Sequence, residues 1–313
     1  MKVLLTGANG FVGNALLMRL NSCNAIQVMG SVRPNAFSLS SGPSKFVFAD
    51  LSSETDWVDI LTGIDVVVHT AARVHVMSDS VENPYEEFHR VNVMGTSVLA
   101  RQAAFCGVRR FIFISSVKVN GESTLPGEPF EEDDVPFPID SYGISKMRAE
   151  IELSNIAKEN EMDVVIIRPP LVYGPAVKAN FASLTRAVQR GWPLPLGAVH
   201  NQRSLVALDN LVDFVLTCIT HSQAANQIFF VSDGHDLSTT ELVRGIAQAS
   251  GVPARLLPLP LCALHAGASL LGKGDAVRRL CGNLQVDISK ARSLLGWVPP
   301  VSVEEGLRRA MAI

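Results

Sequence analysis

The chain has 313 residues, which suffices for one large domain or for a domain with a smaller lobe. Apolar residues make up 47% and charged residues 18%, a composition typical of a globular protein with a large core. The net charge of -3 and the pI near 6.2 argue against the basic stripe of a nucleic-acid-binding protein, so we expect no nucleic acid as a partner.

The cysteines and the hydropathy of the chain indicate in which cellular compartment the protein lies. The cysteines are odd in number, and none of them form a C-x-x-C pair: Cys23, Cys106, Cys218, Cys262 and Cys281. We therefore expect free thiols, no metal site and a cytoplasmic location. The apolar run at the N-terminus is too short for a signal peptide. The longest apolar stretch, 256–271, has two prolines and fewer than 18 residues, which predicts a buried helix or pocket wall and no stable membrane insertion. A peripheral membrane contact is the alternative.

Apolar runs alternate with helical patterns through the first half of the chain. Strands are predicted at residues 2–6, 26–32, 45–49, 65–69, 111–115 and 164–168. The clearest helices between them are predicted at 12–20, 86–106 and 142–160. Because the strands are almost wholly apolar, we expect them to be parallel and buried on both faces. The repeated pattern predicts an α/β fold, a Rossmann-type doubly wound parallel sheet.

Prolines interrupt this alternation after residue 168. A helix at 181–190, a strand at 227–231 and a helix at 239–250 are predicted beyond that point. We divide the chain into a dinucleotide-binding domain, residues 1–168 with 200–232 returning to it, and a smaller C-terminal substrate lobe. The lobe takes residues 169–199 and 233–313.

A glycine motif follows the first predicted strand and opens the first predicted helix. It consists of Gly7, Gly10 and Gly13, with Phe11 and Val12 between the last two. Glycine permits a tight turn and lets backbone N–H groups approach a diphosphate at a helix N-terminus. A plain strand–helix turn is the alternative, but the flanking strand and helix are the context that a dinucleotide site requires. We therefore predict that these five residues bind a dinucleotide.

The residues after the second and third strands bear on the choice of cofactor. In such folds an acid after the second strand binds the ribose of NAD, whereas an arginine accommodates the extra phosphate of NADP. Arg33 stands there without an acid, which favours NADP(H) over NAD(H); the alternative is a solvated surface arginine. Asp50 and Leu51, after the third strand, are candidates for holding the adenine.

Candidate catalytic residues follow the fifth strand and open the helix at 142–160. Tyr142 and Lys146 are four positions apart and share a helical face. An ammonium beside a phenol lowers the pKa of the phenol, which would suit Tyr142 to acid–base chemistry. Ser116 follows a strand at the edge where parallel sheets bind ligands. A surface Tyr–Lys pair and an ordinary serine turn are the alternatives.

Taken in order, these motifs resemble the extended short-chain dehydrogenase/reductases of the NAD-dependent epimerase/dehydratase family. The resemblance covers essentially the whole chain. It rests on the glycine motif, Asp50 with Leu51, residues 69–72, 92–96, 115–116, Tyr142 with Lys146, residues 168–169, 172–175, 286–291 and 295–299.

The resemblance implies that Tyr142 exchanges a proton with a sugar hydroxyl or ketone. It also implies that Lys146 supports Tyr142 and holds the nicotinamide ribose, that Tyr142 lies in the cofactor site, and that Ser116 is the third catalytic residue. It further implies that several residues line the cofactor site, namely Ala71, Ala72, Asn92, Ser115 and Pro169. For the substrate, a UDP-sugar, it implies contacts to the diphosphate from Asn180, from Arg203 and from Arg278 or Arg279. The alternative interpretation for each of these arginines is an ordinary surface charge that binds no ligand.

Two positions depart from the patterns of particular family members. Dehydratases carry an acidic pair where Val117 and Lys118 stand, so a 4,6-dehydratase is the least favoured reaction. Epimerases acting at C4 carry a serine or threonine in place of Lys118 and a tyrosine in place of Asn120, which argues against simple 4-epimerisation. Lys118 is kept among the candidate substrate-binding residues.

Residues 70–77 resemble bacterial polysaccharide-pathway proteins that reduce a UDP-linked ketosugar. We therefore predict an NADPH-dependent C4 ketoreductase of a UDP-4-keto-6-deoxy-N-acetylhexosamine in surface polysaccharide biosynthesis. The first alternative is a 4-epimerase of UDP-glucose or UDP-N-acetylglucosamine. The second is a non-catalytic dinucleotide sensor, which would need none of Ser116, Tyr142 and Lys146. Family members pair the helices corresponding to 86–106 and 142–160 across a two-fold axis, so a homodimer is expected.

Overall fold

A computed structural model describes residues 1–33, 45–74, 83–270, 272 and 274–312 of the chain. Within these residues the largest feature is a seven-stranded sheet with the order β3-β2-β1-β4-β5-β6-β9, in which every pairing is parallel. The strands are β1 (Lys2–Thr6), β2 (Gln27–Val32), β3 (Lys45–Phe48), β4 (Val66–His69), β5 (Arg110–Ile114), β6 (Asp163–Arg168) and β9 (Ile228–Phe230). Each begins and ends within one residue of its prediction. The strand order reverses between β1 and β4, where doubly wound sheets bind their ligands.

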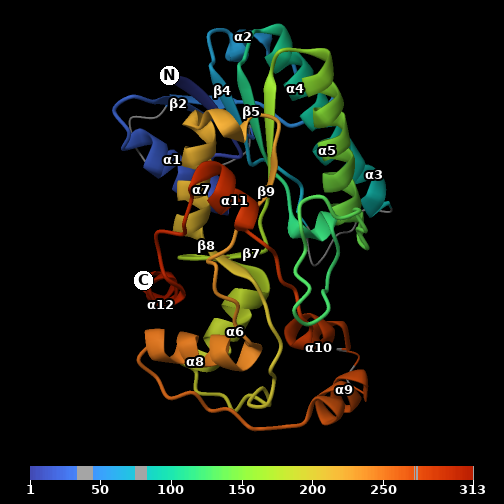
Figure 1. Cartoon of the computed structure of the whole chain (residues 1–313), viewed down its shortest axis with the longest axis vertical. Helices are drawn as coiled ribbons and strands as arrows, with labels where there is room; N and C mark the ends of the chain where they lie inside the picture. Colours follow the sequence, from blue (N-terminus) through green and yellow to red (C-terminus); the bar gives the residue numbers. More distant parts are fainter. Residues whose placement is uncertain (34–44, 75–82, 271, 273, 313) are drawn as a thin grey trace.

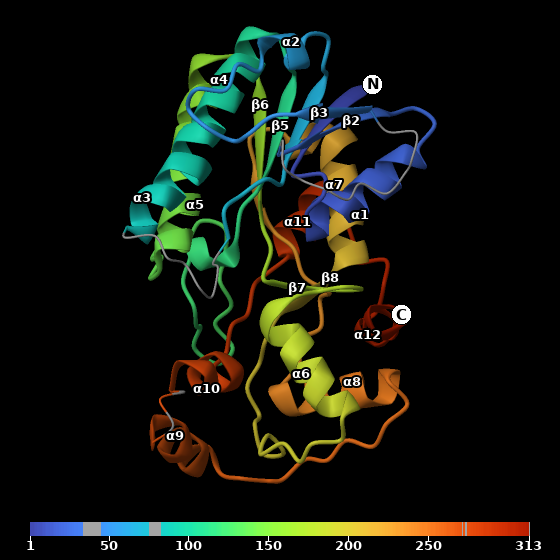
Figure 2. The same cartoon turned by 180° about the vertical axis from the view of Figure 1, so that it is seen from behind.

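Helices cover both faces of this sheet (Figures 1 and 2). On one face lie α1 (Phe11–Asn21) and α7 (Leu208–Thr220). On the other lie α4 (Thr96–Phe105) and α5 (Ser141–Glu159), with the short α2 (Val58–Leu61). The Rossmann-type fold that we predicted from apolar strands is therefore confirmed.

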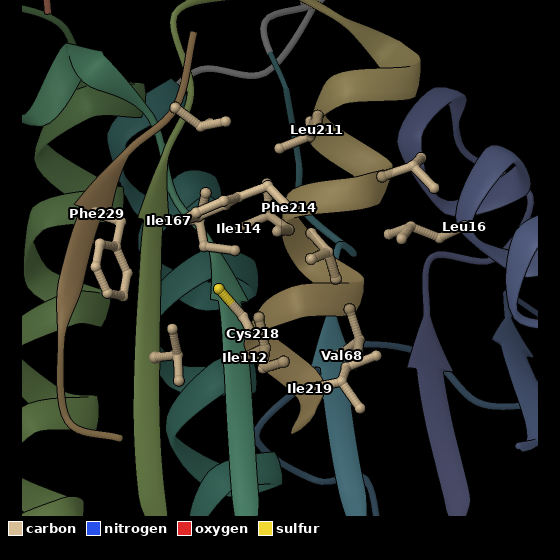
Figure 3. Packing of buried hydrophobic residues seen from close by; sticks show 14 of the residues in the cluster. Leu16, Val68, Ile112, Ile114, Ile167, Leu211, Phe214, Cys218, Ile219 and Phe229 are labelled. Carbon is tan, nitrogen blue, oxygen red and sulfur yellow. The ribbon is translucent and has the colours of Figure 1, made fainter. Parts of the chain in front are cut away.

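The sheet's side chains alternate between two separate apolar cores. Along β5, Ile112 and Ile114 join the core under α1 and α7, whereas Phe111 and Phe113 join the core under α4 and α5. Figure 3 shows the first core, in which Phe214 of α7 lies over the strands. Burial on both faces explains why these strands lack a polar face.

The smaller lobe extends from the carboxyl edge of the large sheet. A two-stranded parallel sheet, β7 (Leu171–Tyr173) and β8 (Leu205–Ala207), starts it, although we had assigned residues 200–232, and with them β8, to the dinucleotide-binding domain. Its helices are α6 (Ala179–Gln189), α8 (Thr239–Ala249), α9 (Leu261–Leu270), α10 (Gly274–Cys281) and α12 (Val303–Met311), while α11 (Ser289–Leu295) packs near β9. A buried network joins the lobe to α7, because the Tyr173 hydroxyl and the Asn210 amide both donate to Asp233, at 2.7 Å each.

The helix expected at 86–106 is divided in the structure. It comprises α3 (Pro84–Phe88), the π-helical η1 (His89–Gly95) and α4. Short 3-10 turns, η2 (Val117–Val119) and η3 (Ser222–Ala224), complete the described elements. A π-helical stretch inside a helix is rare and often marks a functional position, so η1 is a feature to trace into the site.

All five cysteines are free thiols. Among the described residues, no group of three His, Cys, Asp or Glu side chains is placed to hold a metal ion. None of the helices in the described part of the chain is long and apolar enough to cross a membrane.

Candidate active site

The glycine motif forms a close turn between β1 and α1. Gly7 has a φ of +69°, and a Cβ there would lie 2.8 Å from the backbone nitrogen of Ala71. A Cβ on Gly13 would lie only 2.0 Å from the Gly7 carbonyl oxygen. Both positions therefore require glycine. Gly10 is the N-cap of α1, and no side chain among the described residues makes a capping hydrogen bond there. The backbone N–H groups of Phe11 and Val12, in the first turn of α1, are therefore not capped by a side chain.

This turn fits the diphosphate of a dinucleotide, since a helix N-terminus with exposed N–H groups favours an anion. Ala71 and Ala72 follow β4, the strand that pairs with β1. The N–H of Ala71 donates to the hydroxyl of Thr6, the last residue of β1, at 3.3 Å. Because Gly7 lies so close to Ala71, the glycine turn and the segment after β4, both predicted to bind the cofactor, are neighbours in the structure.

His69, at the end of β4, holds this edge together. Its Nδ1 lies 2.6 Å from the Thr6 hydroxyl, and its Nε2 lies 3.0 Å from the Thr96 hydroxyl of α4. Burial lowers the pKa of His69 to about 3, and the charge of Lys146 acts in the same direction. The ring is therefore a neutral link between β1, β4 and α4. We had noted His69 only as part of a motif, because sequence does not show what its ring contacts.

Asn92 lies in η1 and fixes the segment after β4 to α5. Its side-chain oxygen accepts from the N–H of Arg73 at 2.8 Å, and its nitrogen donates to the Arg73 carbonyl and the Ser145 hydroxyl, at 3.0 Å each. Asn92 and Ser145 are both buried. From the π-helical turn, the Asn92 side chain thus links the segment after β4 to α5, the helix that carries Tyr142.

Tyr142 and Lys146 lie in the first turns of α5, as predicted. The Lys146 ammonium donates to the Ile114 carbonyl at 2.8 Å and lies 4.4 Å from the centre of the Phe113 ring. Burial lowers the pKa of Lys146 to about 7, although the charge of Glu150 opposes this. The ammonium is 6.0 Å from the centre of the Tyr142 ring.

The pKa of Tyr142 is raised, first by burial and then by the negative charge of Asp140. Our expectation that Lys146 lowers this pKa is therefore wrong for the arrangement seen here. Asp140 precedes α5 as its N-cap and accepts from the N–H of Gly143 at 2.7 Å. An aspartate three residues before a glycine at a helix start is a readable capping signal that we did not use.

Ser116 begins η2, beside the start of α5. Its hydroxyl accepts from the N–H of Lys118 at 3.2 Å, and the Pro169 carbonyl accepts from the N–H of Val117 at 3.0 Å. A Cβ on Gly143 would lie 2.7 Å from the Lys118 carbonyl oxygen, so η2 and α5 are in close contact. The structure therefore brings the segments carrying Ser116, Tyr142 and Pro169 to one edge of the sheet.

The ammonium group of Lys118 is already paired with carboxylates of the protein. Its ammonium donates to Glu122 at 2.9 Å and to Asp140. Burial opposes the charged form, but these two carboxylates outweigh it and raise the pKa of Lys118. Because two negative charges surround one positive charge, we do not expect Lys118 to attract a further anion.

Ser115 faces away from the candidate site into a buried polar network. Its hydroxyl donates to Glu150, which is also paired with Arg168 at 2.6 Å. Arg168 donates further to the Asn120 side-chain oxygen at 3.0 Å. Both charged side chains are almost fully buried. The Ser115 hydroxyl therefore serves the packing of β5, β6 and α5.

A hollow of about 400 Å³ borders the segment after Ser116. Asn120, Glu122 and Phe130 are among its lining residues. The side-chain nitrogen of Asn120 is buried and finds no hydrogen-bond partner in the described part of the chain. An unpaired buried donor is costly to stability.

The remaining candidates lie nearer to the surface. Arg33 is exposed after β2, and Asp50 is exposed while its carboxylate accepts from the N–H of Leu51 at 2.9 Å. Leu51 is buried and packs against Gly95 of η1. Residues 34–44 and 75–82 lie outside the described residues, so the motif at 75–77 has no structural account.

The predicted diphosphate contacts are distributed over the smaller lobe. Asn180 is exposed in the first turn of α6, and both Arg278 and Arg279 are exposed on α10. Arg203 is half-buried and donates to the Gly282 carbonyl at 3.0 Å, directly after α10. Burial lowers the pKa of Arg203. The structure thus ties Arg203 to the element that carries the other two arginines.

Comparisons with known proteins identify the family of the chain. A family model described as the NAD dependent epimerase/dehydratase family matches residues 3–232. A UDP-glucose 4-epimerase of Vibrio cholerae is 50% identical over 308 residues, covering 98% of this chain and 93% of that protein. The chain therefore belongs to the NAD dependent epimerase/dehydratase family. The predicted family is confirmed, as is an NAD(P)-dependent sugar-nucleotide epimerase or reductase as the enzyme class.

Two more distant matches complete these comparisons. An N-acetyl-alpha-D-glucosaminyl-diphospho-ditrans,octacis-undecaprenol 4-epimerase of Escherichia coli O157:H7 is 29% identical, covering 99% of this chain and 94% of that protein. The solved structure of a UDP-glucuronic acid 4-epimerase of Bacillus cereus in complex with NAD superposes with a TM-score of 0.79. It is 24% identical and covers 99% of this chain and 97% of that chain, which shows the fold.

Proposed function

We propose that the chain is a UDP-sugar 4-epimerase that uses NAD. The observation that carries this proposal is the 50% identity, over nearly the full length, to the UDP-glucose 4-epimerase of Vibrio cholerae. It favours our alternative over the NADPH-dependent ketoreductase that we had preferred. The departures at Lys118 and Asn120 had argued against 4-epimerisation, but Lys118 is held by Glu122 and Asp140 within the protein.

The choice of NAD is supported by the family description and by the Bacillus cereus structure in complex with NAD, and it must be weighed against Arg33. Arg33 is exposed, and no described contact holds its guanidinium toward the glycine turn. Its presence after β2 is therefore a weak reason to prefer NADP. An epimerase returns its cofactor to the starting state in every turnover, which suits a dinucleotide held without exchange.

In this proposal the residues of the chain have distinct tasks. The turn at Gly7–Gly13 and the first N–H groups of α1 hold the diphosphate, and Lys146 lies toward the ribose. When bound, the nicotinamide ring supplies a hydride acceptor and donor at the sugar's C4. Tyr142 would take the proton from the C4 hydroxyl as the hydride leaves C4, and would return it to the C4 oxygen when the hydride is added back to the opposite face of the ketone, while Ser116 donates a hydrogen bond to the same oxygen.

The pKa values explain why a cation matters at Tyr142. Burial and Asp140 keep the phenol protonated, so it can act as an acid but accepts a proton poorly. A positive charge near the phenol stabilises the phenolate. Lys146, whose pKa is about 7, can supply such a charge only at and below neutral pH.

One experiment separates the candidate reactions. Purified chain is given UDP-glucose and, in parallel, UDP-N-acetylglucosamine, and the products are resolved while absorbance of reduced cofactor is followed. Interconversion with the C4 epimer and no net change in absorbance supports the epimerase. Consumption of NADPH with a UDP-4-keto-6-deoxy-N-acetylhexosamine, without epimerisation, would instead establish the ketoreductase. Binding of dinucleotide with no turnover of any of these would point to a sensor.

A further inference from the structure

The outer end of the smaller lobe exposes an apolar surface. Leu257 is 47% exposed and Leu261 is 39% exposed. The sequence of α9 contains no charged residue, and among its described residues only Leu264 is buried. Figure 1 shows α9 at the end of the molecule away from the large sheet. Exposed apolar side chains gathered in one segment mark an interaction site more often than scattered single residues do.

An exposed tryptophan lies on the neighbouring segment of the lobe. Trp192 is 55% exposed and follows α6. Two residues later, Leu194 forms a β-bridge with Leu256, its N–H donating to the Arg255 carbonyl at 2.8 Å. The segment that carries Trp192 and the segment that leads into α9 are therefore bound to each other. Tryptophan has an apolar ring with one polar N–H, which suits the boundary between water and lipid.

Arginines flank this apolar surface. The guanidinium of Arg190 lies 5.7 Å from the centre of the Trp192 ring. A Cβ on Gly191 would lie 3.7 Å from Nε of Arg255, so the second arginine is adjacent. Both arginines are exposed. Long basic side chains of this kind can lie along an apolar surface while their charged ends reach phosphate groups.

The charge of the two segments is one-sided. The chain has 30 acidic residues, but none lies in 164–208 or in 242–274. The first of these stretches has five lysines and arginines, and the second has three. Arg168 is buried and Arg203 is half-buried, so the exposed basic side chains of the two stretches include Arg190 and Arg255, with no acidic residue in the same stretches. Such a surface attracts anions and repels another copy of itself.

From the apolar helix, the tryptophan and the acid-free basic surround, we propose that this end of the lobe docks on an anionic membrane surface. The contact is peripheral, with Trp192, Leu257 and Leu261 at the headgroup level and Arg190 and Arg255 on lipid phosphates. A symmetric contact between two copies would bring the same arginines toward each other, which disfavours a self-association site. The inference does not depend on the reaction that the chain catalyses.

The test uses the full chain with lipid vesicles. Vesicles of phosphatidylcholine alone are compared with vesicles that also contain phosphatidylglycerol, and bound protein is measured by flotation. We expect binding to the anionic vesicles only, and its loss at roughly 0.5 M salt because added salt screens the charges. Absence of binding to the anionic vesicles would overturn the proposal.

Two exposed double variants identify the surface, and circular dichroism checks that each remains folded. Arg190→Glu with Arg255→Glu should weaken vesicle binding by at least about tenfold, because each basic residue near such a surface contributes measurably. Trp192→Ser with Leu257→Ser should weaken it similarly. The control, Met18→Ser with Lys45→Glu, changes exposed residues outside the lobe and should bind as the parent does.

Two outcomes with these variants would contradict the proposal. The first is that both double variants bind the anionic vesicles as tightly as the parent. The second is that Trp192→Ser with Leu257→Ser lowers the molar mass in solution without changing vesicle binding, which would assign the surface to a second copy of the chain.

Discussion

At the carboxyl edge of the large sheet, polar side chains are buried and bind one another, whereas in the smaller lobe several candidate binding side chains lie at the surface. Asn92, Lys146 and Glu150 each have partners within the protein. Asn180 and Arg279 are exposed. The first region is therefore set by packing before any ligand arrives. The second leaves its polar groups available, so it can vary with the substrate at small cost to the fold.

The largest effect is expected where the packed edge meets the reaction. Tyr142→Phe removes the only group at this edge that we assign to proton transfer, and turnover should fall by about a thousandfold. The affinity for the UDP-sugar should change little, since the ring remains. Tyr85→Phe, which alters another partly buried tyrosine on α3, is the matched control and should keep full activity. Turnover by Tyr142→Phe at the parent rate would refute the catalytic role.

The buried ion pair below this edge should be the next most sensitive element. Glu150→Gln keeps the shape of the side chain but leaves the buried Arg168 without its carboxylate. The free energy of unfolding should fall by about 3 to 5 kcal/mol, measured by urea denaturation. Glu152→Gln breaks the exposed pair with Arg101 and should cost less than about 1 kcal/mol. Equal losses for the two variants would mean that burial does not set the strength of the pair.

Glycine 13 tests the fit of the dinucleotide turn. In Gly13→Ala the new Cβ would lie 2.0 Å from the Gly7 carbonyl oxygen, so the turn must open. We expect a loss of about 1 to 3 kcal/mol in the free energy of unfolding, and purified protein without bound dinucleotide. In Gly10→Ala the new Cβ would lie 3.1 Å from the same oxygen, so this variant should retain more of its stability and more of its bound dinucleotide. Retention of dinucleotide by Gly13→Ala at the parent level would contradict this account.

The same contrast explains what the sequence could predict. Buried parallel strands are continuous apolar runs, and a strand–turn–helix with three glycines has few other uses, so the sheet and the glycine turn were both predicted. The helix α7 was not predicted, although its apolar residues at 208, 211, 212, 215 and 218–219 recur at helical spacing, a signal that we did not use. The π-helical turn was missed because Asn92 bonds to residues 19 and 53 positions away.

The reaction was harder to predict than the fold for a related reason. Lys118 was weighed as a departure from epimerases, but its charge is countered by Asp140, 22 positions along the chain. The direction of the pKa shift at Tyr142 likewise depends on burial and on Asp140, which the Tyr–Lys spacing does not reveal. Residues that act through distant partners carry no local pattern, so their roles emerge only once the chain is folded.

The smallest expected effect is a pH dependence of stability that belongs to His69. The folded protein keeps this ring neutral down to a pKa of about 3, whereas in the unfolded chain the usual value is 6.5. Below pH 6.5 the unfolded state therefore binds a proton that the folded state does not. The contribution of His69 to stability should fall as the pH falls, by about 2 kcal/mol between pH 6.5 and 5.

His69→Gln should remove this slope, because glutamine does not titrate. The free energy of unfolding of the variant lies below that of the parent at pH 7, since contacts to Thr6 and Thr96 are altered, but the difference should shrink as the pH approaches 5. A constant difference between His69→Gln and the parent across this range would mean that His69 is protonated in the folded protein, and that the packed edge tolerates a charge which its burial should exclude.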